Sequence, residues 1–147
     1  MLFITLLCND CGYRHNDVVS LEASEPLRYE LVVEGVEDLN TRVIRSSSAR
    51  IRIPELGVVV EPGPQAEGFI SNVEGVLERI ERASSALRDE KPSRYQQFLE
   101  KIMAAKRGKL RFRLILEDPY GCSAIVSPKA KRRRLSSQEL AKLLRRS

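Results

Sequence analysis

The sequence predicts a mainly β domain of the α+β class that carries an inserted pair of helices. Apolar and polar residues alternate in segments 27–34, 49–53 and 110–116, which is typical of strands in a sheet with one solvated side. Residues 58–60 are three valines and continue this pattern. Arginines alternate with the apolar residues of 49–53 and 110–116, so we expect these arginines to face water. Turn-forming residues separate the segments at 34–35, 61–64 and 118–121.

The period changes from that of a strand to that of a helix in the middle of the chain. Ser71 and Glu74 have the spacing of a capping box, and one helical face then collects Val73, Val76, Leu77, Ile80, Ala83 and Leu87. Pro92 ends this run, Ser93 can cap a second helix, and Gly108 stops it. The second helix is expected to bury Phe98, Leu99, Ile102 and, at the margin, Met103. We therefore expect an antiparallel helical hairpin over about 71–107.

Cys8 and Cys11, followed by Gly12, form a Cys-x-x-Cys-Gly turn that is typical of one half of a four-cysteine zinc site. Completing a tetrahedral site from this chain would need both Cys122 and His15; otherwise another chain or oxygen donors would have to contribute. The alternative is a redox pair, or simply two thiols in a turn. A knuckle between two strands fits better than a redox motif, because an extended segment and not a helix follows Gly12. We expect Cys122 to be a small buried residue.

Length and composition indicate a single soluble domain, with 147 residues of which 42% are hydrophobic and 31% charged. No apolar run reaches the roughly 18 residues of a membrane span. The apolar start at 1–7 lacks the basic flank and cleavage site of a signal peptide. Three cysteines, an odd number, agree with a reducing compartment. We therefore expect a cytoplasmic protein with no membrane partner.

Segment 127–147 is expected to be a basic tail outside the domain. It carries eight basic residues against one acidic residue, so its net charge is +7 and the rest of the chain is slightly acidic. The run Lys131, Arg132, Arg133 and Arg134 can neutralise phosphates, which favours salt-dependent binding to RNA or ribosomes; a solvated charged segment is the alternative. Ser136 and Glu139 form a capping box, and a leucine stripe follows, so we expect a short helix in the tail.

Few residues are suited to catalysis. The pairs that could act are His15 with Asp17 and Cys122 with Asp118, and neither has a supporting third group in the sequence. No Gly-rich phosphate loop, metalloprotease helix or Gly-x-Ser-x-Gly nucleophile elbow occurs. We therefore expect a binding protein and not an enzyme.

Five motifs occur in the order and approximate spacing of one known family. They are CNDCGYR at 8–14, DLNTRVIRS at 38–46, ARIRIPEL at 49–56, GFISNVEG at 68–75 and DPYGCS at 118–123. Together they make the chain similar to the ZPR-type zinc-finger family, as a compact, single-module, archaeal member. The resemblance implies a zinc ribbon, here a half ribbon over 1–16. It also implies that 17–126 form a double-stranded β-helix or jelly-roll-like domain carrying the helical hairpin.

The resemblance also implies a partner. Eukaryotic members, in which the module recurs twice, bind translation elongation factor 1-alpha and are implicated in folding the newly made factor. The motif residues that would contact this partner here are Asp38, Asn40, Arg42, Arg45, Pro54, Glu55, Glu74 and Asp118. Several have structural alternatives: Asp38 and Asn40 can bond their own backbone. Glu74 can be the reciprocal cap of Ser71, and Asp118 can shape a β-turn.

Two departures from the family pattern affect these expectations. The family's first Cys-x-x-Cys has no match, so Cys8 and Cys11 form an incomplete zinc site; we expect a start codon placed too late, or a truncation, rather than true loss. Cys122 stands where the family usually has asparagine. Because a thiol is a poor hydrogen-bonding group, any role of that side chain in the turn or in partner contact is weakened.

Overall fold

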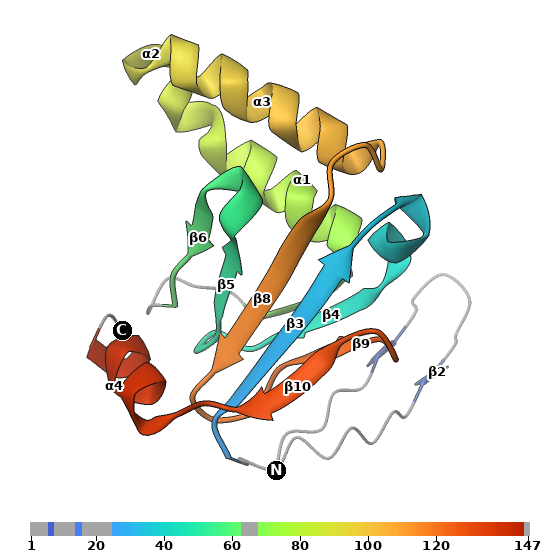
Figure 1. The fold of residues 1–147 in the computed structure, drawn as a ribbon, viewed down its shortest axis with the longest axis vertical. Helices are drawn as coiled ribbons and strands as arrows, with labels where there is room; N and C mark the ends of the chain where they lie inside the picture. Colours follow the sequence, from blue (N-terminus) through green and yellow to red (C-terminus); the bar gives the residue numbers. More distant parts are fainter. Residues whose placement is uncertain (1–5, 8–13, 16–24, 63–67, 146–147) are drawn as a thin grey trace.

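The structure is a computed structural model that describes residues 6–7, 14–15, 25–62 and 68–145. Two antiparallel sheets form its body (Figure 1). The larger sheet has the order β10-β3-β8-β5-β6. Its strands are β3 (Leu27–Val33), β5 (Arg50–Ile53), β6 (Val58–Val60), β8 (Phe112–Asp118) and β10 (Lys131–Arg134). The smaller sheet has the order β7-β4-β9, from β4 (Arg42–Arg45), β7 (Phe69–Asn72) and β9 (Ala124–Val126).

The helices are inserted between β7 and β8 and project together from one end of the sheets (Figure 1). They are α1 (Val73–Ala83), the 3₁₀ turn η3 (Ser84–Ala86), α2 (Leu87–Glu90) and α3 (Pro92–Lys106). Two more 3₁₀ turns, η1 (Val36–Asn40) and η2 (Pro54–Leu56), connect strands, and α4 (Ser137–Arg145) follows β10. The expected mainly β fold with a helical hairpin is therefore confirmed. Within the described ranges, no helix is long and apolar enough to cross a membrane.

One hydrophobic core joins both sheets and the hairpin. Its members alternate along the strands as the sequence predicted, and they come from β3, β5 and β8 in the large sheet. The core includes Leu31, Val33, Val43, Ile51, Ile53, Val73, Val76, Leu77, Ile80, Ile102, Ala105, Phe112, Leu114, Leu116 and Ile125. Burial of this apolar set supplies the main drive for folding, and it anchors α1 and α3 on the sheets.

The caps of both long helices differ from the expectation. Asn72, and not Ser71, caps α1, because its side chain accepts a hydrogen bond from the Gly75 N–H at 2.8 Å. Ser71 is a strand residue that pairs with Val43, so the helix begins one residue later than the motif suggested. In α3, Pro92 takes a first helical position and no side-chain cap bond forms, consistent with the fixed φ of proline.

Three apolar residues expected inside are exposed. Ala83 is exposed and Leu87 is 40% exposed, because α1 ends at Ala83 and the chain turns through η3 before α2. Met103 is also 40% exposed. It follows Ile102, which is fully buried, and successive helical residues point about 100° apart. Met103 therefore lies beside the buried face of α3 and not on it.

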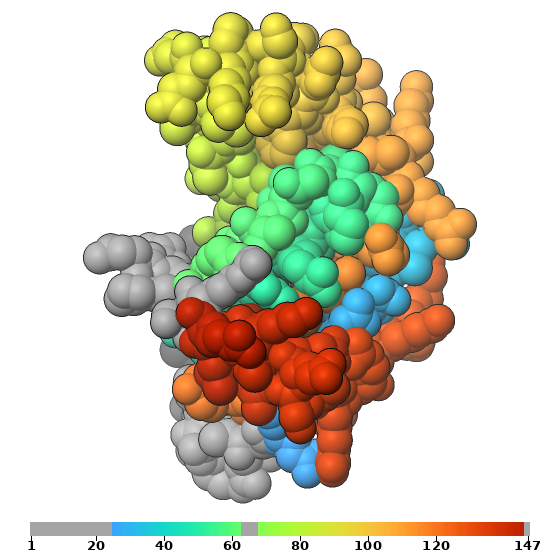
Figure 2. All heavy atoms as spheres, turned by 60° about the vertical axis from the view of Figure 1, so that its left-hand side comes forward, coloured from blue at the N-terminus to red at the C-terminus, as the bar shows by residue number. Residues whose placement is uncertain are grey.

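Of the arginines expected to face water, Arg111 and Arg113 are exposed, whereas Arg50 and Arg52 are partly covered. The side chain of Arg50 is 11% exposed and that of Arg52 is 33% exposed, and both form ion pairs with Glu117, whose side chain is 2% exposed. Ile115, on the same face of β8, is 2% exposed. The outer face of the large sheet is therefore shielded near the end of β8. In Figures 1 and 2, α4 lies at this end of the molecule.

The expected basic tail is part of the domain, and this is a correction. β10 pairs with β3 in antiparallel register from Lys131 opposite Glu30 to Arg134 opposite Leu27. The α4 helix has the expected capping box between Ser136 and Glu139. The strand was missed because four consecutive cations show no alternation of polar and apolar residues, whereas the pairing with β3 uses only the backbone.

Candidate partner-binding site

Asp118, one of the motif residues, holds two turns together inside the protein. It is 1% exposed, and its carboxylate accepts hydrogen bonds from the hydroxyls of Ser46 at 2.8 Å and Ser48 at 3.1 Å in the β4–β5 turn. In its own turn it accepts bonds from the hydroxyl of Ser123 and the N–H groups of Tyr120 and Cys122. These contacts support the structural alternative for Asp118, since a buried carboxylate needs such donors.

Arg45 is also buried, at 6% exposure. Its guanidinium donates to the carbonyl oxygens of Ala49 and Glu61, both at 3.2 Å, and lies 5.8 Å from the centre of the Phe69 ring. Burial lowers the pKa of Arg45 from its ordinary value. This side chain ties the start of β5 to the end of β6, so its position is that of a structural residue.

Pro54, which is exposed, and Glu55, which is partly exposed, begin η2. The Glu55 carboxylate accepts hydrogen bonds from the backbone N–H and the side-chain Nε of Arg113, each at 2.9 Å. Partial burial raises the pKa of Glu55, but the bonds from Arg113 outweigh it, so that the pKa lies below the ordinary value. Glu55 therefore braces η2 against β8.

Asp38 bonds the backbone and a lysine. It accepts a hydrogen bond from the Glu34 N–H at 2.9 Å, as its structural alternative predicted, and its carboxylate lies 2.9 Å from Nζ of Lys129. The Lys129 ammonium and the Glu34 N–H hold the pKa of Asp38 below its usual range. Asp38 thus fixes η1 to the segment between β9 and β10.

Asn40, Arg42 and Glu74 differ from the other polar motif residues because all three are exposed. They lie close together, since the Val73 N–H donates to the Thr41 carbonyl at 3.0 Å and joins the start of α1 to the start of β4. Val126, which is 54% exposed, lies opposite Arg42 in the β4–β9 pairing. We call Asn40, Arg42, Glu74 and Val126 the exposed strip. Among the described residues, Asn40 and Glu74 have no side-chain hydrogen bond or ion pair, so the predicted Glu74–Ser71 cap does not form.

The pair of Cys122 and Asp118 loses support as a catalytic pair, whereas Asp17 of the pair with His15 lies outside the described residues. The Cys122 N–H donates to Asp118, which confirms that the two residues are neighbours. However, burial and the negative charge of Asp118 raise the pKa of the Cys122 thiol, which disfavours the nucleophilic thiolate. The Asp118 carboxylate is already occupied by its donors. Cys122 is half-buried, less so than expected.

The predicted metal ligands Cys8 and Cys11 lie outside the described residues. β1 (Leu6–Leu7) and β2 (Arg14–His15) on either side of them pair in antiparallel fashion, as a knuckle between two strands requires. Within the described ranges, no group of three His, Cys, Asp or Glu side chains could hold a metal ion. This finding concerns sites built wholly from the described residues, so Cys8 and Cys11 remain predicted ligands.

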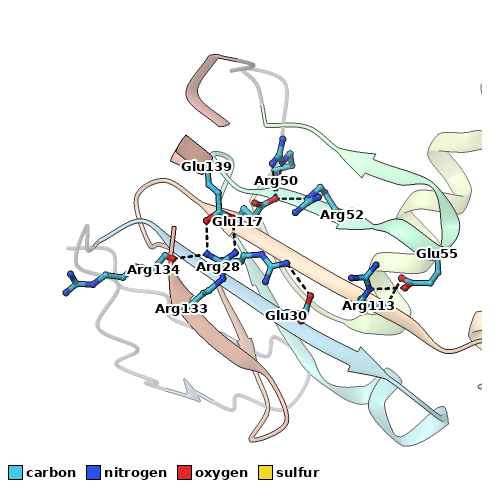
Figure 3. Close-up of polar contacts among 10 residues, drawn as sticks. All are labelled: Arg28, Glu30, Arg50, Arg52, Glu55, Arg113, Glu117, Arg133, Arg134 and Glu139. Carbon is cyan, nitrogen blue, oxygen red and sulfur yellow. Dashed lines mark hydrogen bonds and ion pairs between the residues drawn. The ribbon is translucent and has the colours of Figure 1, made fainter. Parts of the chain in front are cut away.

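The proposed nucleic-acid cluster is a strand with partly neutralised charges. All four residues of β10 are exposed, but Arg133 forms a two-bond ion pair with Glu139 at 2.7 and 2.8 Å (Figure 3). The guanidinium of Arg134 lies 2.6 Å from the carboxylate oxygen Oε1 of Glu25. Within the described part of the chain, only Lys131 and Arg132 of this strand are without an ion-pair partner. Ion pairing therefore weakens the case for this cluster as a phosphate-binding site.

Comparison with known proteins decides the family. Residues 37–143 match the family model described as the ZPR1 jelly-roll domain. The chain belongs to the ZPR1 family. It is 45% identical over 148 residues to an uncharacterized ZPR1-like protein of Methanocaldococcus jannaschii, which covers 97% of this chain and 75% of that protein. It is 31% identical over 134 residues to the zinc finger chaperone zpr1 of Schizosaccharomyces pombe, with 84% of this chain and 29% of that protein covered.

Membership of the ZPR1 family confirms the resemblance and the jelly-roll expectation. A second ZPR1-like protein, from Pyrococcus horikoshii, is 44% identical over 147 residues, with 95% of this chain and 66% of that protein covered. The chain thus spans about two thirds to three quarters of these two ZPR1-like relatives and under a third of the Schizosaccharomyces pombe protein. Because the match to the ZPR1 jelly-roll domain extends to residue 143, β10 and most of α4 belong to the family's domain.

The structure also gives ion-pairing roles to two polar residues, Glu117 and Lys129, that no motif or pattern in the sequence had indicated. Glu117 pairs with Arg50 and Arg52, and Lys129 pairs with Asp38 (Figure 3 shows the Glu117 group). Glu117 lies opposite Arg50 in the β5–β8 register. If the register of β5 and β8 had been known, it would have predicted the ion pairs of Glu117 with Arg50 and Arg52, because opposite charges across a strand pair stabilise one another. No local signal marks Lys129.

Proposed function

We propose that this ZPR1-family chain is a cytoplasmic protein that binds translation elongation factor 1-alpha and assists its folding. The observation that carries the proposal is the exposed strip. Asn40, Arg42 and Glu74 belong to the family motifs, yet they are exposed at one place on the surface while Asp118 and Arg45 are buried. Exposed polar residues are suited to partner contact.

Two further observations support binding rather than catalysis. The Schizosaccharomyces pombe relative carries the name of a zinc finger chaperone, which describes a protein that acts on other proteins. In this chain, the thiol of Cys122 has a raised pKa and the Asp118 carboxylate serves the turns around it. The chemistry of the exposed strip, with one cation, one anion, one amide and one valine, fits a small mixed protein interface.

Zinc forms part of the proposal. Cys8 and Cys11 would supply two thiolate ligands between β1 and β2. Zinc bound there would fix the hairpin formed by the two strands. Cys8→Ser and Cys11→Ser should each reduce the zinc content measured by atomic absorption. An equal zinc content in both variants and the unchanged protein would rule out these ligands.

The proposed function is tested by titrating the protein with elongation factor 1-alpha from the same source. The titration uses GDP and a GTP analogue at physiological salt. We expect saturable binding, and a loss of about tenfold in affinity for Arg42→Glu or Glu74→Lys. Arg82→Glu is the matched control, since Arg82 is exposed on α1 outside the motifs. Equal affinities for all three variants would reject the exposed strip, and no binding of the unchanged protein in either nucleotide state would reject the partner.

A further inference from the structure

Among the strands that the structure describes, β10 forms an edge of the large sheet. It stands first in the order β10-β3-β8-β5-β6, with β3 as its hydrogen-bonded neighbour. All of its residues are exposed, and Figure 1 shows it at the margin of the described sheet. An edge strand offers unpaired backbone N–H and C=O groups to another chain.

The register identifies which backbone groups face outward. The Leu135 N–H donates to the Pro26 carbonyl at 3.0 Å, and Arg133 lies opposite Arg28. In an antiparallel pair, residues that exchange hydrogen bonds alternate with residues that do not. Residues 131 and 133 therefore bond β3, and the N–H and C=O of Arg132 point away from it. Arg134 also points outward, but its carbonyl accepts a bond from the Arg133 side chain at 3.1 Å.

The side chains of β10 place one cation without an ion-pair partner among the described residues on each face of this edge. Because successive strand residues point to opposite faces, Lys131 and Arg133 lie on one face and Arg132 and Arg134 on the other. Lys131 and Arg132 have no ion-pair partner among the described residues. A strand placed beside β10 would meet a positive charge on either face.

From these observations we propose that β10 is a docking edge for an extended, acidic segment of a partner protein. The segment would add a strand beside β10, with backbone bonds to Arg132 and with consecutive acidic side chains opposite the cations on the two faces. A second copy of this chain fits poorly, because two β10 edges would place like charges opposite each other, which is destabilising. This site uses residues other than the exposed strip and does not depend on the proposed function.

A protected edge and a phosphate-binding surface would each behave differently from a docking edge. Basic residues protect edge strands from association, in which case no strand-forming peptide would bind. A phosphate-binding surface would bind RNA through charge alone, with a steep dependence on salt. A docking edge differs from both because it requires backbone N–H donors and acceptors in the ligand.

The test uses a labelled nine-residue peptide with three consecutive glutamates flanked by valine and threonine. Its affinity is measured by fluorescence anisotropy with the full chain at physiological salt. We expect saturable binding, and at least about tenfold weaker binding of the same peptide with N-methylated glutamates. Equal binding of the N-methylated peptide, tighter binding of a ten-nucleotide oligouridylate, or no peptide binding at millimolar concentration would each overturn the proposal.

Two substitutions of Arg132 test the edge, while the N-methylated peptide tests the backbone bonds alone. Arg132→Pro removes an outward N–H together with the guanidinium charge but no bond to β3, at a position where edge strands tolerate proline. Arg132→Glu keeps the N–H and reverses the charge. Each should weaken peptide binding at least about tenfold, whereas Arg82→Glu on α1 should not change it. Unchanged affinity in Arg132→Glu would overturn the proposal. If melting shows that Arg132→Pro is unfolded, Arg132→Glu and the N-methylated peptide decide.

Discussion

Motif residues at two places in the molecule have opposite environments. Near the β4–β5 and β8–β9 turns, Asp118 and Arg45 are 1% and 6% exposed and bond serine hydroxyls and backbone groups. Where α1 begins, Asn40, Arg42 and Glu74 are exposed. Residues of the same motifs therefore support the fold in one place and are accessible to a partner in the other. Membership in a motif does not by itself distinguish these roles.

Burial explains the difference. A buried polar group must find its hydrogen bonds within the protein, because leaving it unsatisfied costs about 1–3 kcal/mol. Asp118 meets this requirement through serines 70 and 72 positions away, and Arg45 does so through the carbonyl groups of Ala49 and Glu61. An exposed group can bond water instead, so Asn40 and Glu74 carry no comparable constraint from the fold. Substitutions at the two places should accordingly separate stability from binding.

The largest effect is expected at the buried place, for Asp118→Ala. Removing the carboxylate leaves the hydroxyls of Ser46, Ser48 and Ser123 and two backbone N–H groups without their acceptor. The free energy of unfolding, measured by urea denaturation, should fall by about 3 kcal/mol or more. Asp89→Ala, at an exposed position of α2, is the control and should change it by less than about 0.5 kcal/mol. A loss below about 1 kcal/mol for Asp118→Ala would contradict the structural role.

Glu117→Gln should give the next largest loss in the free energy of unfolding. The change removes the negative charge between Arg50 and Arg52, whose side chains are 11% and 33% exposed. Breaking a buried pair leaves a charge without its partner. Because Arg52 is partly solvated, we expect a loss of about 2 kcal/mol in urea denaturation rather than the larger value of a fully buried pair. Glu100→Gln on the exposed side of α3 should leave the stability unchanged.

Two glycines offer a matched comparison in which the expected effect on stability is of intermediate size. Gly108 and Gly57 both have positive φ, at 71° and 66°, where a side chain costs about 1 kcal/mol. A Cβ at Gly108 would also lie 2.9 Å from the backbone nitrogen of Val36, whereas a Cβ at Gly57 has nothing within 4 Å. Gly108→Ala should therefore lower the melting temperature more than Gly57→Ala. Equal shifts in melting temperature would mean that Val36 moves away from the added Cβ at Gly108 without loss of stability.

A smaller effect, with a pH signature, is expected for Glu139. The Arg133 guanidinium and the Ser136 N–H lower the pKa of Glu139 from 4.5 to about 2. Because the folded pKa lies below the unfolded value, the stabilisation is complete above about pH 5 and is lost as the pH falls toward 2. Glu139→Gln should lower the free energy of unfolding by about 1 kcal/mol at neutral pH. The difference in the free energy of unfolding between Glu139→Gln and the unchanged protein, measured by urea denaturation, should become smaller as the pH falls. A difference that stays constant with pH would contradict the lowered pKa of Glu139.

The smallest effect on stability is expected on the exposed strip. Arg42→Glu should change the free energy of unfolding by less than about 0.5 kcal/mol, while it lowers affinity for elongation factor 1-alpha by about tenfold. Differential scanning calorimetry and the binding titration together measure both quantities. A large loss of stability with no specific loss of binding would move Arg42 into the structural group with Asp118.

The sequence by itself determined the elements whose signals are local. Alternation with a period of two predicted the strands around Leu31, Ile51 and Leu114, and the helical period predicted the hairpin between Val73 and Lys106. The capping box of α4 was likewise readable, because Ser136 and Glu139 are three residues apart. Each of these signals depends on neighbours within one or two turns of the chain.

Only the tertiary structure decided the roles of the polar residues. Ser46 bonds Asp118 across 72 positions and Lys129 bonds Asp38 across 91, and the pairing of β10 with β3 joins opposite ends of the domain. No periodicity encodes such contacts, because they arise when the apolar core brings distant segments together. The same packing made Asn72 the cap of α1 by placing Ser71 in a strand, and it left Arg42 and Glu74 at the surface.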